Sequence, residues 1–231
     1  MPEFALVAED GCVPLDVLTY IAAAVDLQMR RDVSPLLDTG EPWTVGALTS
    51  LEGLRDAPGV RKVLTFRRKL GVAGALGFHT ETAGIDYAEC LPPKFVGQTI
   101  DGTTASHEVI ETFGDPGCDQ AWPMPNGSKV DFELSDPVEA DSYPITVKIG
   151  SESRVVMVSN FVTPAWFGLD DGPRFDFLGL LKAPFTMTPG GYYRIVDISG
   201  AEDYVYADAD SRARVAAKLA NPTSRLSRRN G

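Results

Sequence analysis

The chain has 231 residues, of which 44% are hydrophobic and 23% are charged, so it can bury a substantial core as a globular protein. Its formal net charge of -11 argues against a nucleic-acid-binding surface over most of the molecule. No apolar run reaches the roughly 18 residues of a membrane span, and the first residues lack the charged and then apolar pattern of a signal peptide. We therefore expect neither a membrane span nor a secretion signal.

The N-terminal half predicts a strand, a long helix and then several short strands. Residues 4–7 have strand character, and Pro14 suits the first turn of a helix because its missing N–H needs no partner there. Apolar residues at helical spacing extend this helix to about Val33, and we expect Ser34-Pro35 to stop it, since the residue before a proline avoids the helical region. Strands are expected over residues 43–48, 61–66, 75–82 and 85–90, with a short helix before Pro58 and a break at Ala83-Gly84.

A second helix carries the most informative motif of the chain. It is expected to begin with Thr103 or Thr104 as its N-cap and to end at Gly114-Asp115-Pro116. Residues 104–111 (TASHEVIE) form a variant of the zinc-protease signature H-E-x-x-H, with glutamate in the last position. His107 and Glu111 project from one helical face and can bind the same ion, since carboxylate oxygen is an acceptable zinc ligand. Glu108 lies about 100° round the helix, where it could act as the catalytic base towards a water that the metal activates.

A catalytic zinc normally has three protein ligands, so a third ligand must lie elsewhere in the chain. Glu133, on a strand predicted over residues 129–134, is our first choice, because its separation from Glu111 resembles that in zinc proteases whose third ligand is a downstream glutamate. Asp136 on the same segment and Asp115 at the end of the helix are the alternatives. Zinc is the expected ion. Calcium is an alternative because Asp136, Glu139 and Asp141 are clustered oxygen donors, and a site without metal is another.

The second histidine, His79, falls on a strand that should form the edge of the sheet beside the cleft. A histidine on a strand ordinarily hydrogen-bonds a backbone group, and a contact with substrate or metal is the alternative. The cysteines Cys12, Cys90 and Cys118 are too few and too widely spaced for a disulfide framework or a cysteine-type zinc site, so free thiols are expected.

The C-terminal half is expected to be rich in loops. A turn at Asn126-Gly127 leads to the strand over residues 129–134, and a hairpin turns at Gly150 between strands over 145–149 and 155–158. Residues 160–188 hold many aromatic side chains and predict an irregular, aromatic-packed cover rather than a regular element. A last strand is expected over residues 192–198. The basic residues of the last segment form either a solvated terminus or a docking surface for an acidic partner; they are Arg212, Arg214, Lys218, Arg225, Arg228 and Arg229.

The order of these elements, together with four passages, resembles a family of zincin-like metallopeptidases that tailed bacteriophages and prophages encode. The passages are residues 25–35 (VDLQMRRDVSP), 106–116 (SHEVIETFGDP), 132–141 (FELSDPVEAD) and 159–167 (SNFVTPAWF). The resemblance implies an α+β fold: a twisted mixed sheet with a long backing helix, a metal-site helix and a loop-rich aromatic C-terminal part. We expect a single zincin-like domain over residues 1–200, followed by a basic helix or tail over residues 201–231.

Two functions follow from the resemblance. The first is a structural protein of the bacteriophage virion, in the tail or its adaptor region, that keeps the zincin-like shell without depending on proteolysis. The alternative is an active zinc-dependent endopeptidase with Glu108 as general base. A glutamate in place of the second histidine makes the bound ion a weaker Lewis acid, which favours the first function. The expected partners are other virion proteins and further copies of this chain, nucleic acid is expected only at the basic tail, and the expected location is the virion after synthesis in the host cytoplasm.

Overall fold

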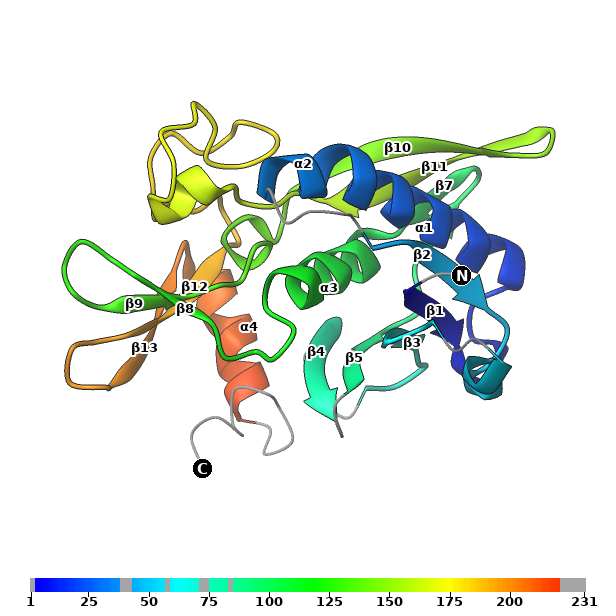
Figure 1. Cartoon of the computed structure of the whole chain (residues 1–231), viewed down its shortest axis with the longest axis horizontal. Coiled ribbons are helices and arrows are strands. Elements are labelled where there is room, and N and C mark those ends of the chain that lie inside the picture. Colours follow the sequence, from blue (N-terminus) through cyan, green and yellow to red (C-terminus); the bar gives the residue numbers. More distant parts are fainter. Residues whose placement is uncertain (1–2, 38–42, 57–58, 71–74, 83–84, 221–231) are drawn as a thin grey trace.

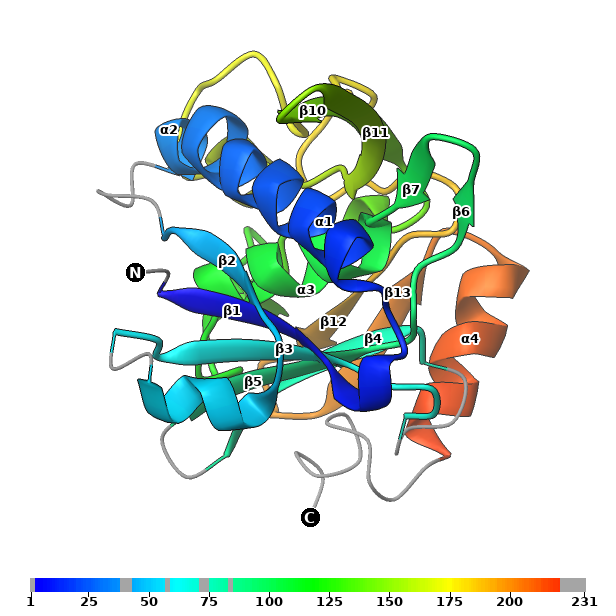
Figure 2. The ribbon, with the colours of Figure 1, turned by 90° about the vertical axis from the view of Figure 1, so that its right-hand side faces the viewer.

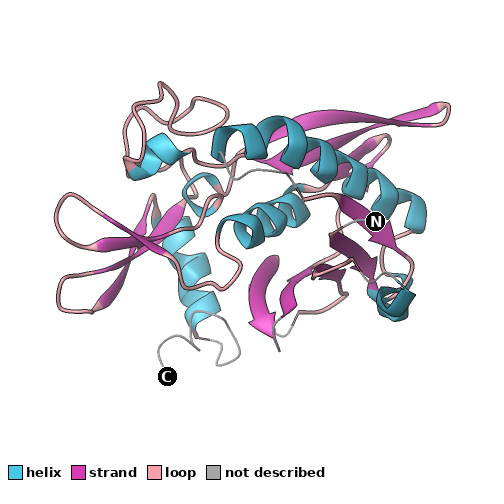
Figure 3. Ribbon diagram, in the orientation of Figure 1, coloured by secondary structure: helices cyan, strands magenta, loops and turns pink. Residues whose placement is uncertain are grey.

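A five-stranded sheet and two helices that pack on one of its faces form the centre of the protein (Figure 1). The computed structural model describes residues 3–37, 43–56, 59–70, 75–82 and 85–220. Within these ranges the chain is a mixed α+β protein with three sheets (Figure 3). The α+β class expected from the sequence is therefore confirmed.

The five-stranded sheet has the order β2-β1-β3-β5-β4. Its first four strands are parallel, and β4 joins β5 in the antiparallel direction at the edge. Side chains alternate between the faces, so that Phe4 and Leu6 point to the main core while Ala5 and Val7 join a smaller cluster on the other face. The strands are β1 (Phe4–Ala8), β2 (Val45–Leu48), β3 (Lys62–Phe66), β4 (Gly77–Thr82) and β5 (Ile85–Cys90).

The long N-terminal helix α1 (Leu15–Gln28) crosses this face, as Figure 2 shows. It does not stop at Ser34-Pro35 as the sequence predicts. A π-helical turn, Met29–Val33, follows α1 directly and leads into a further helical turn, α2 (Ser34–Leu37). Pro35 is the second residue of α2, and the Ser34 N–H before it still bonds back to the Met29 carbonyl through the π turn. The prediction was wrong here because the wider π turn restarts the helix one residue before the proline.

A second sheet covers the other side of the helices, in the order β10-β11-β7-β6. Helix α3 (Thr103–Gly114) begins directly after β7 and contacts β11, α1 and the strands β3, β4 and β5, so it lies between the two sheets (Figure 2). The hairpin predicted around Gly150 is confirmed as β10 and β11. The strands are β6 (Phe95–Val96), β7 (Thr99–Asp101), β10 (Ser142–Ile149) and β11 (Glu152–Ser159).

The third sheet, in the order β13-β12-β9-β8, belongs to the C-terminal half. The strand predicted over residues 129–134 ends early, at Asp131, and a 3-10 turn at Asp136–Val138 follows. The strand predicted last, β12, pairs with one more strand, β13, which the sequence analysis missed, and helix α4 contacts β13. The elements are β8 (Ala121–Pro123), β9 (Lys129–Asp131), β12 (Tyr192–Val196), β13 (Glu202–Tyr206) and α4 (Ala209–Leu219).

The aromatic segment over residues 160–188 is irregular, as expected. It contains one 3-10 turn, Pro164–Phe167, and an isolated bridge between Val162 and Asp176. Trp166 is fully buried and donates its indole N–H to the carbonyl of Thr186 at 2.7 Å. Some predicted features lie outside the described residues. They are the break at Ala83-Gly84, Pro58, and the tail residues Arg225, Arg228 and Arg229. Two further 3-10 turns, Glu9–Gly11 and Leu51–Asp56, lie in the N-terminal half.

A buried hydrogen-bond network fastens the end of α1 to the second sheet. Gln28 donates to the Tyr143 hydroxyl at 3.0 Å and to the carbonyl of Ser159 at 2.9 Å. The Tyr143 hydroxyl in turn donates to Asp32 at 2.8 Å. Burial, and then the neighbouring Asp32 carboxylate, raise the pKa of Tyr143, so the hydroxyl stays a donor.

We predict that Tyr143→Phe lowers the free energy of unfolding by about 1–3 kcal/mol, because it leaves Gln28 and Asp32 buried with one partner fewer. Urea denaturation followed by circular dichroism measures this change. Tyr206→Phe is the matched control, since that ring lies partly exposed on β13 and stacks on Tyr204. Equal stability of the two variants would contradict the role given to the network.

Candidate metal centre

Helix α3 places its polar side chains in a buried environment, which is unusual for a helix with this many charges. Residues 105–113 are all buried, because α3 has sheets on two sides. The helix begins at Thr103 with Gly102 as its N-cap, so neither threonine expected at the cap takes that position. Asp101 instead accepts a hydrogen bond from the Thr103 N–H at 3.2 Å, which satisfies one free donor of the first turn.

The first group of possible ligands consists of His107, Glu111 and Asp136, all buried. His107 Nε2 lies 3.0 Å from Glu111 Oε1 and 3.4 Å from Asp136 Oδ1. Two atoms bound to one tetrahedral zinc at about 2.0–2.1 Å lie roughly 3.3 Å apart, so these separations suit a shared ion. Glu111 Oε1 is buried and accepts no well-directed hydrogen bond within the described residues, although His107 Nε2 lies 3.0 Å away.

A second group consists of His79, Glu111 and Glu133, also buried. His79 Nδ1 lies 3.4 Å from Glu111 Oε2 and 3.4 Å from Glu108 Oε2. His79 comes from the edge strand β4, as the sequence predicts, and Glu133 comes from the connection between β9 and the 3-10 turn. His79 therefore lies among possible metal ligands.

The residues expected as ligands thus divide between two groups. His107 and Glu111 meet Asp136, one of the two alternatives for the third ligand, whereas Glu133 meets Glu111 and His79. Asp115 lies apart from both groups, and its carboxylate accepts the backbone N–H groups of Asp119 and Gln120. Asp115 therefore closes the turn that follows α3.

Two acidic residues that suggested calcium are engaged in other contacts. Glu139 forms an ion pair with Arg214 of α4 at 3.1 Å. Asp141 accepts a hydrogen bond from the Thr188 hydroxyl. Since Ca²⁺ takes six to eight oxygen ligands and each group contains an imidazole, the donor set suits zinc or another transition metal better.

The charges of His107 and Glu111 support one another. Burial by itself would lower the pKa of His107, but the carboxylates of Glu111 and Asp136 outweigh it and hold that pKa well above its ordinary value. Burial would raise the pKa of Glu111, and the charge of His107 reverses this and holds it well below its ordinary value. Both shifts favour an imidazolium beside a carboxylate, and a metal ion would compete with that proton.

Tyr192 on β12 completes the surroundings of the first group, and the sequence analysis missed it. Burial, and then the charges of Asp136, Glu139 and Glu111, raise the pKa of its hydroxyl well above the ordinary value. Its hydroxyl contacts Asp136, which holds that carboxylate in place, as second partners of metal ligands commonly do. No pattern in the sequence distinguishes Tyr192 from the other tyrosines of the chain.

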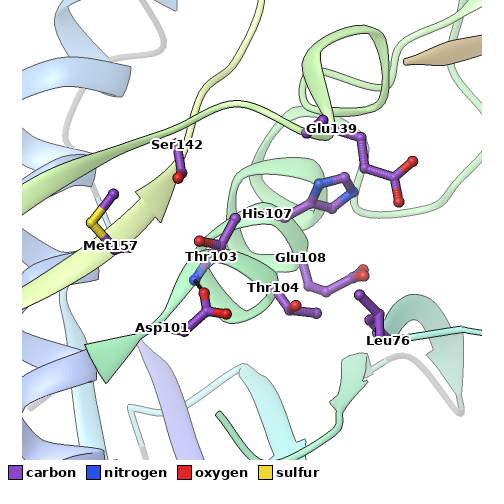
Figure 4. A pocket seen from close by; sticks show the side chains of 11 residues that line it. Leu76, Asp101, Thr103, Thr104, His107, Glu108, Glu139, Ser142 and Met157 are labelled. Carbon is purple, nitrogen blue, oxygen red and sulfur yellow. Dashed lines mark hydrogen bonds between the residues drawn. The ribbon is translucent and has the colours of Figure 1, made fainter. Parts of the chain in front are cut away.

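A pocket of about 470 Å³ opens onto His107 and Glu108. Leu76 and Gly77 before and at the start of β4 form one wall, and Ala140 and Ser142 belong to the opposite one. Figure 4 shows the Glu108 carboxylate directed towards Leu76 and the imidazole of His107 near Glu139. Of the first group, His107 lines this cavity, and Glu108 lines it as well.

Gly77 permits the close approach of β4 to α3. A Cβ atom at this position would lie 2.7 Å from Glu108 Oε1 and 2.7 Å from the Thr104 methyl group. The close packing of β4 on α3 therefore requires a glycine at this position.

Comparison of the chain with protein-family models, with curated proteins and with solved structures finds no match. Among the described residues no helix is both long and apolar enough to cross a membrane.

We predict that Gly77→Ala lowers the free energy of unfolding by about 1–3 kcal/mol, because the added methyl group overlaps Glu108 and Thr104. Gly53→Ala is the control, since a Cβ atom there meets nothing within 4 Å. Thermal and urea unfolding of both variants measure the difference. A Gly77→Ala protein as stable as the wild type would mean that α3 and β4 are not packed as tightly as described.

Proposed function

We propose that this chain is a metal-dependent hydrolase of polypeptides with a zincin-like arrangement of its site, in which His107, Glu111 and Asp136 hold a zinc ion. The observation that carries the proposal is that His107 of this buried group and Glu108 line the same pocket. The zincin-like features are an edge strand antiparallel to its neighbour, a helix with the H-E-x-x-E motif beneath it, and a long helix behind.

The residues present fit such an ion. They offer one imidazole nitrogen and two carboxylate oxygens, and a catalytic zinc commonly has three protein ligands of these kinds. A bound zinc ion would polarise a substrate carbonyl and lower the pKa of a water molecule towards 7. Protons compete for the same atoms, so zinc affinity should fall as the pH is lowered.

Glu108 is the residue proposed to move the proton. It follows His107 on the helix, lines the pocket, and has its Oε2 atom 3.4 Å from His79 Nδ1. Gly77 leaves room for its other oxygen at the pocket wall. From this position the carboxylate can take a proton from an attacking water and later return it to the leaving amine, as a general base and acid does.

The edge strand supports a peptide as the substrate class. Strand β4 is the last strand of its sheet within the described residues, and Gly77 at its start borders the pocket. An extended peptide can add to such an edge through main-chain hydrogen bonds, which would bring its carbonyl groups past Glu108 and His107.

Membership of a phage virion stays a prediction from the resemblance and is independent of the metal site. A virion protein with this site could be an enzyme or could keep the ion as a structural element. The two carboxylate ligands would reduce the Lewis acidity of the ion, and this favours a structural role for it. Hydrolysis is therefore the property to measure.

We predict that Glu108→Gln leaves the zinc content unchanged and abolishes peptide hydrolysis, because the amide cannot accept the proton. His107→Gln should lose both the zinc and the activity. Zinc is measured by elemental analysis of the purified protein, and hydrolysis with a library of quenched fluorescent peptides and with unfolded casein. Glu152→Gln, on the exposed start of β11, is the control and should match the wild type.

Equal cleavage by the wild type and Glu108→Gln would remove Glu108 from the mechanism. Zinc binding without any cleavage by the wild type would leave a structural ion and sink the proposed activity.

A further inference from the structure

We propose that a second divalent cation binds between His79, Glu111 and Glu133, so that the Glu111 carboxylate bridges two ions. The inference rests on the first metal site proposed above and extends it to a dinuclear centre. It arises from the second group of buried ligands, which the mechanism of a single zinc ion leaves unused.

The two oxygens of Glu111 face different partners. Oε1 lies 3.0 Å from His107 Nε2, and Oε2 lies 3.4 Å from His79 Nδ1. The ligand atoms of each group all lie within 4.8 Å of one another, and Glu111 belongs to both groups. A carboxylate with one oxygen in each of two ligand sets is suited to hold two ions a short distance apart, as in sites whose metals are about 3.5–4 Å apart.

The two positions offer the same kind of ligands. Each has one imidazole nitrogen and two carboxylate oxygens, and the chain supplies its two histidines one to each position. The ligands come from separate parts of the fold: β4 gives His79, α3 gives His107 and Glu111, and the segment after β9 gives Glu133 and Asp136. This donor set suits Zn²⁺, Mn²⁺ or Fe²⁺ at both positions.

The balance of charge favours two ions over one. Glu108, Glu111, Glu133 and Asp136 are 5%, 4%, 7% and 8% exposed, so four carboxylates share one buried space. Two protonated imidazoles could supply at most two positive charges, and one divalent ion supplies the same. Two divalent ions with neutral imidazoles would balance all four carboxylates, which matters because unbalanced charge is costly to bury.

A second ion would also offset the low Lewis acidity that the H-E-x-x-E motif gives a single ion. A glutamate ligand gives the first ion more negative charge than a histidine would, and so reduces its power to polarise a substrate. When that glutamate is shared, it divides its charge between two ions, and each remains a stronger Lewis acid. The glutamate at the last position of the motif is then the residue that a dinuclear centre requires.

The number of bound ions tests this proposal. The full-length protein is loaded with ZnCl₂ or MnCl₂, freed of excess ion, and analysed for metal per chain. The wild type should hold two ions, His79→Gln and Glu133→Gln one each, and Glu111→Gln neither ion tightly. Glu108→Gln and Glu152→Gln should hold two. Circular dichroism checks that each variant is folded. Because His79→Gln and Glu133→Gln change different parts of the fold, the test still holds if one of them fails to fold.

Electron paramagnetic resonance of the Mn²⁺-loaded protein gives an independent measure, because two Mn²⁺ ions this close are magnetically coupled. The coupled signal should be present in the wild type and in Glu108→Gln and be lost in His79→Gln. A wild type that holds one ion, retained in His79→Gln and lost in His107→Gln, would overturn the second site and leave the proposed function standing. Two ions without any hydrolysis would support the second site and overturn the proposed activity, and a wild type that binds no ion would overturn both.

Discussion

The burial of negative charge around Glu111 is the constraint on which the site depends. Helix α3 lies between two sheets, so the carboxylates of Glu108 and Glu111 are taken out of water. Isolated carboxylates in such a place are costly, and they persist only with cations or protons nearby. His107 lies 3.0 Å from one oxygen of Glu111, and His79 lies 3.4 Å from the other. Divalent ions at the two proposed positions would neutralise this charge with the ligands already in place.

The rest of the fold holds the parts of this cluster in register. Gly77 allows β4 to approach α3, and Gly191 allows β12 to approach the 3-10 turn that carries Asp136, since a Cβ atom there would lie 2.2 Å from the carbonyl oxygen of Pro137. Arg214 of α4 pairs with Glu139 and donates to the carbonyl of Gly190 at 2.6 Å. Arg214, which the sequence assigned to a basic tail, thus connects α4 to Glu139 at the wall of the pocket and to the segment that precedes β12.

Much of the metal-site helix could be predicted from the sequence, because its evidence is local. The H-E-x-x-E spacing, the end at Gly114 and the edge strand with His79 all follow from patterns within a few residues. The third ligand could not be chosen this way. The strand ends at Asp131 rather than Leu134, so the chain turns earlier and delivers Asp136, not Glu133, to His107. Tyr192 and Gly77 likewise owe their roles to elements distant in the sequence, and no local pattern distinguishes them.

The last position of the motif has a different meaning once the tertiary contacts are known. In the sequence alone, Glu111 in place of histidine suggests a loss of catalytic power, since a carboxylate ligand makes a single zinc ion a weaker Lewis acid. A neutral imidazole at this position would bind one ion through a single nitrogen, whereas a carboxylate has two oxygens that can bind different ions. The Glu111 carboxylate presents one oxygen to His107 and the other to His79, and His79 supplies a second imidazole from strand β4. Two imidazoles therefore lie around this helix, and in the proposed dinuclear centre the Glu111 carboxylate is the ligand that both ions would share.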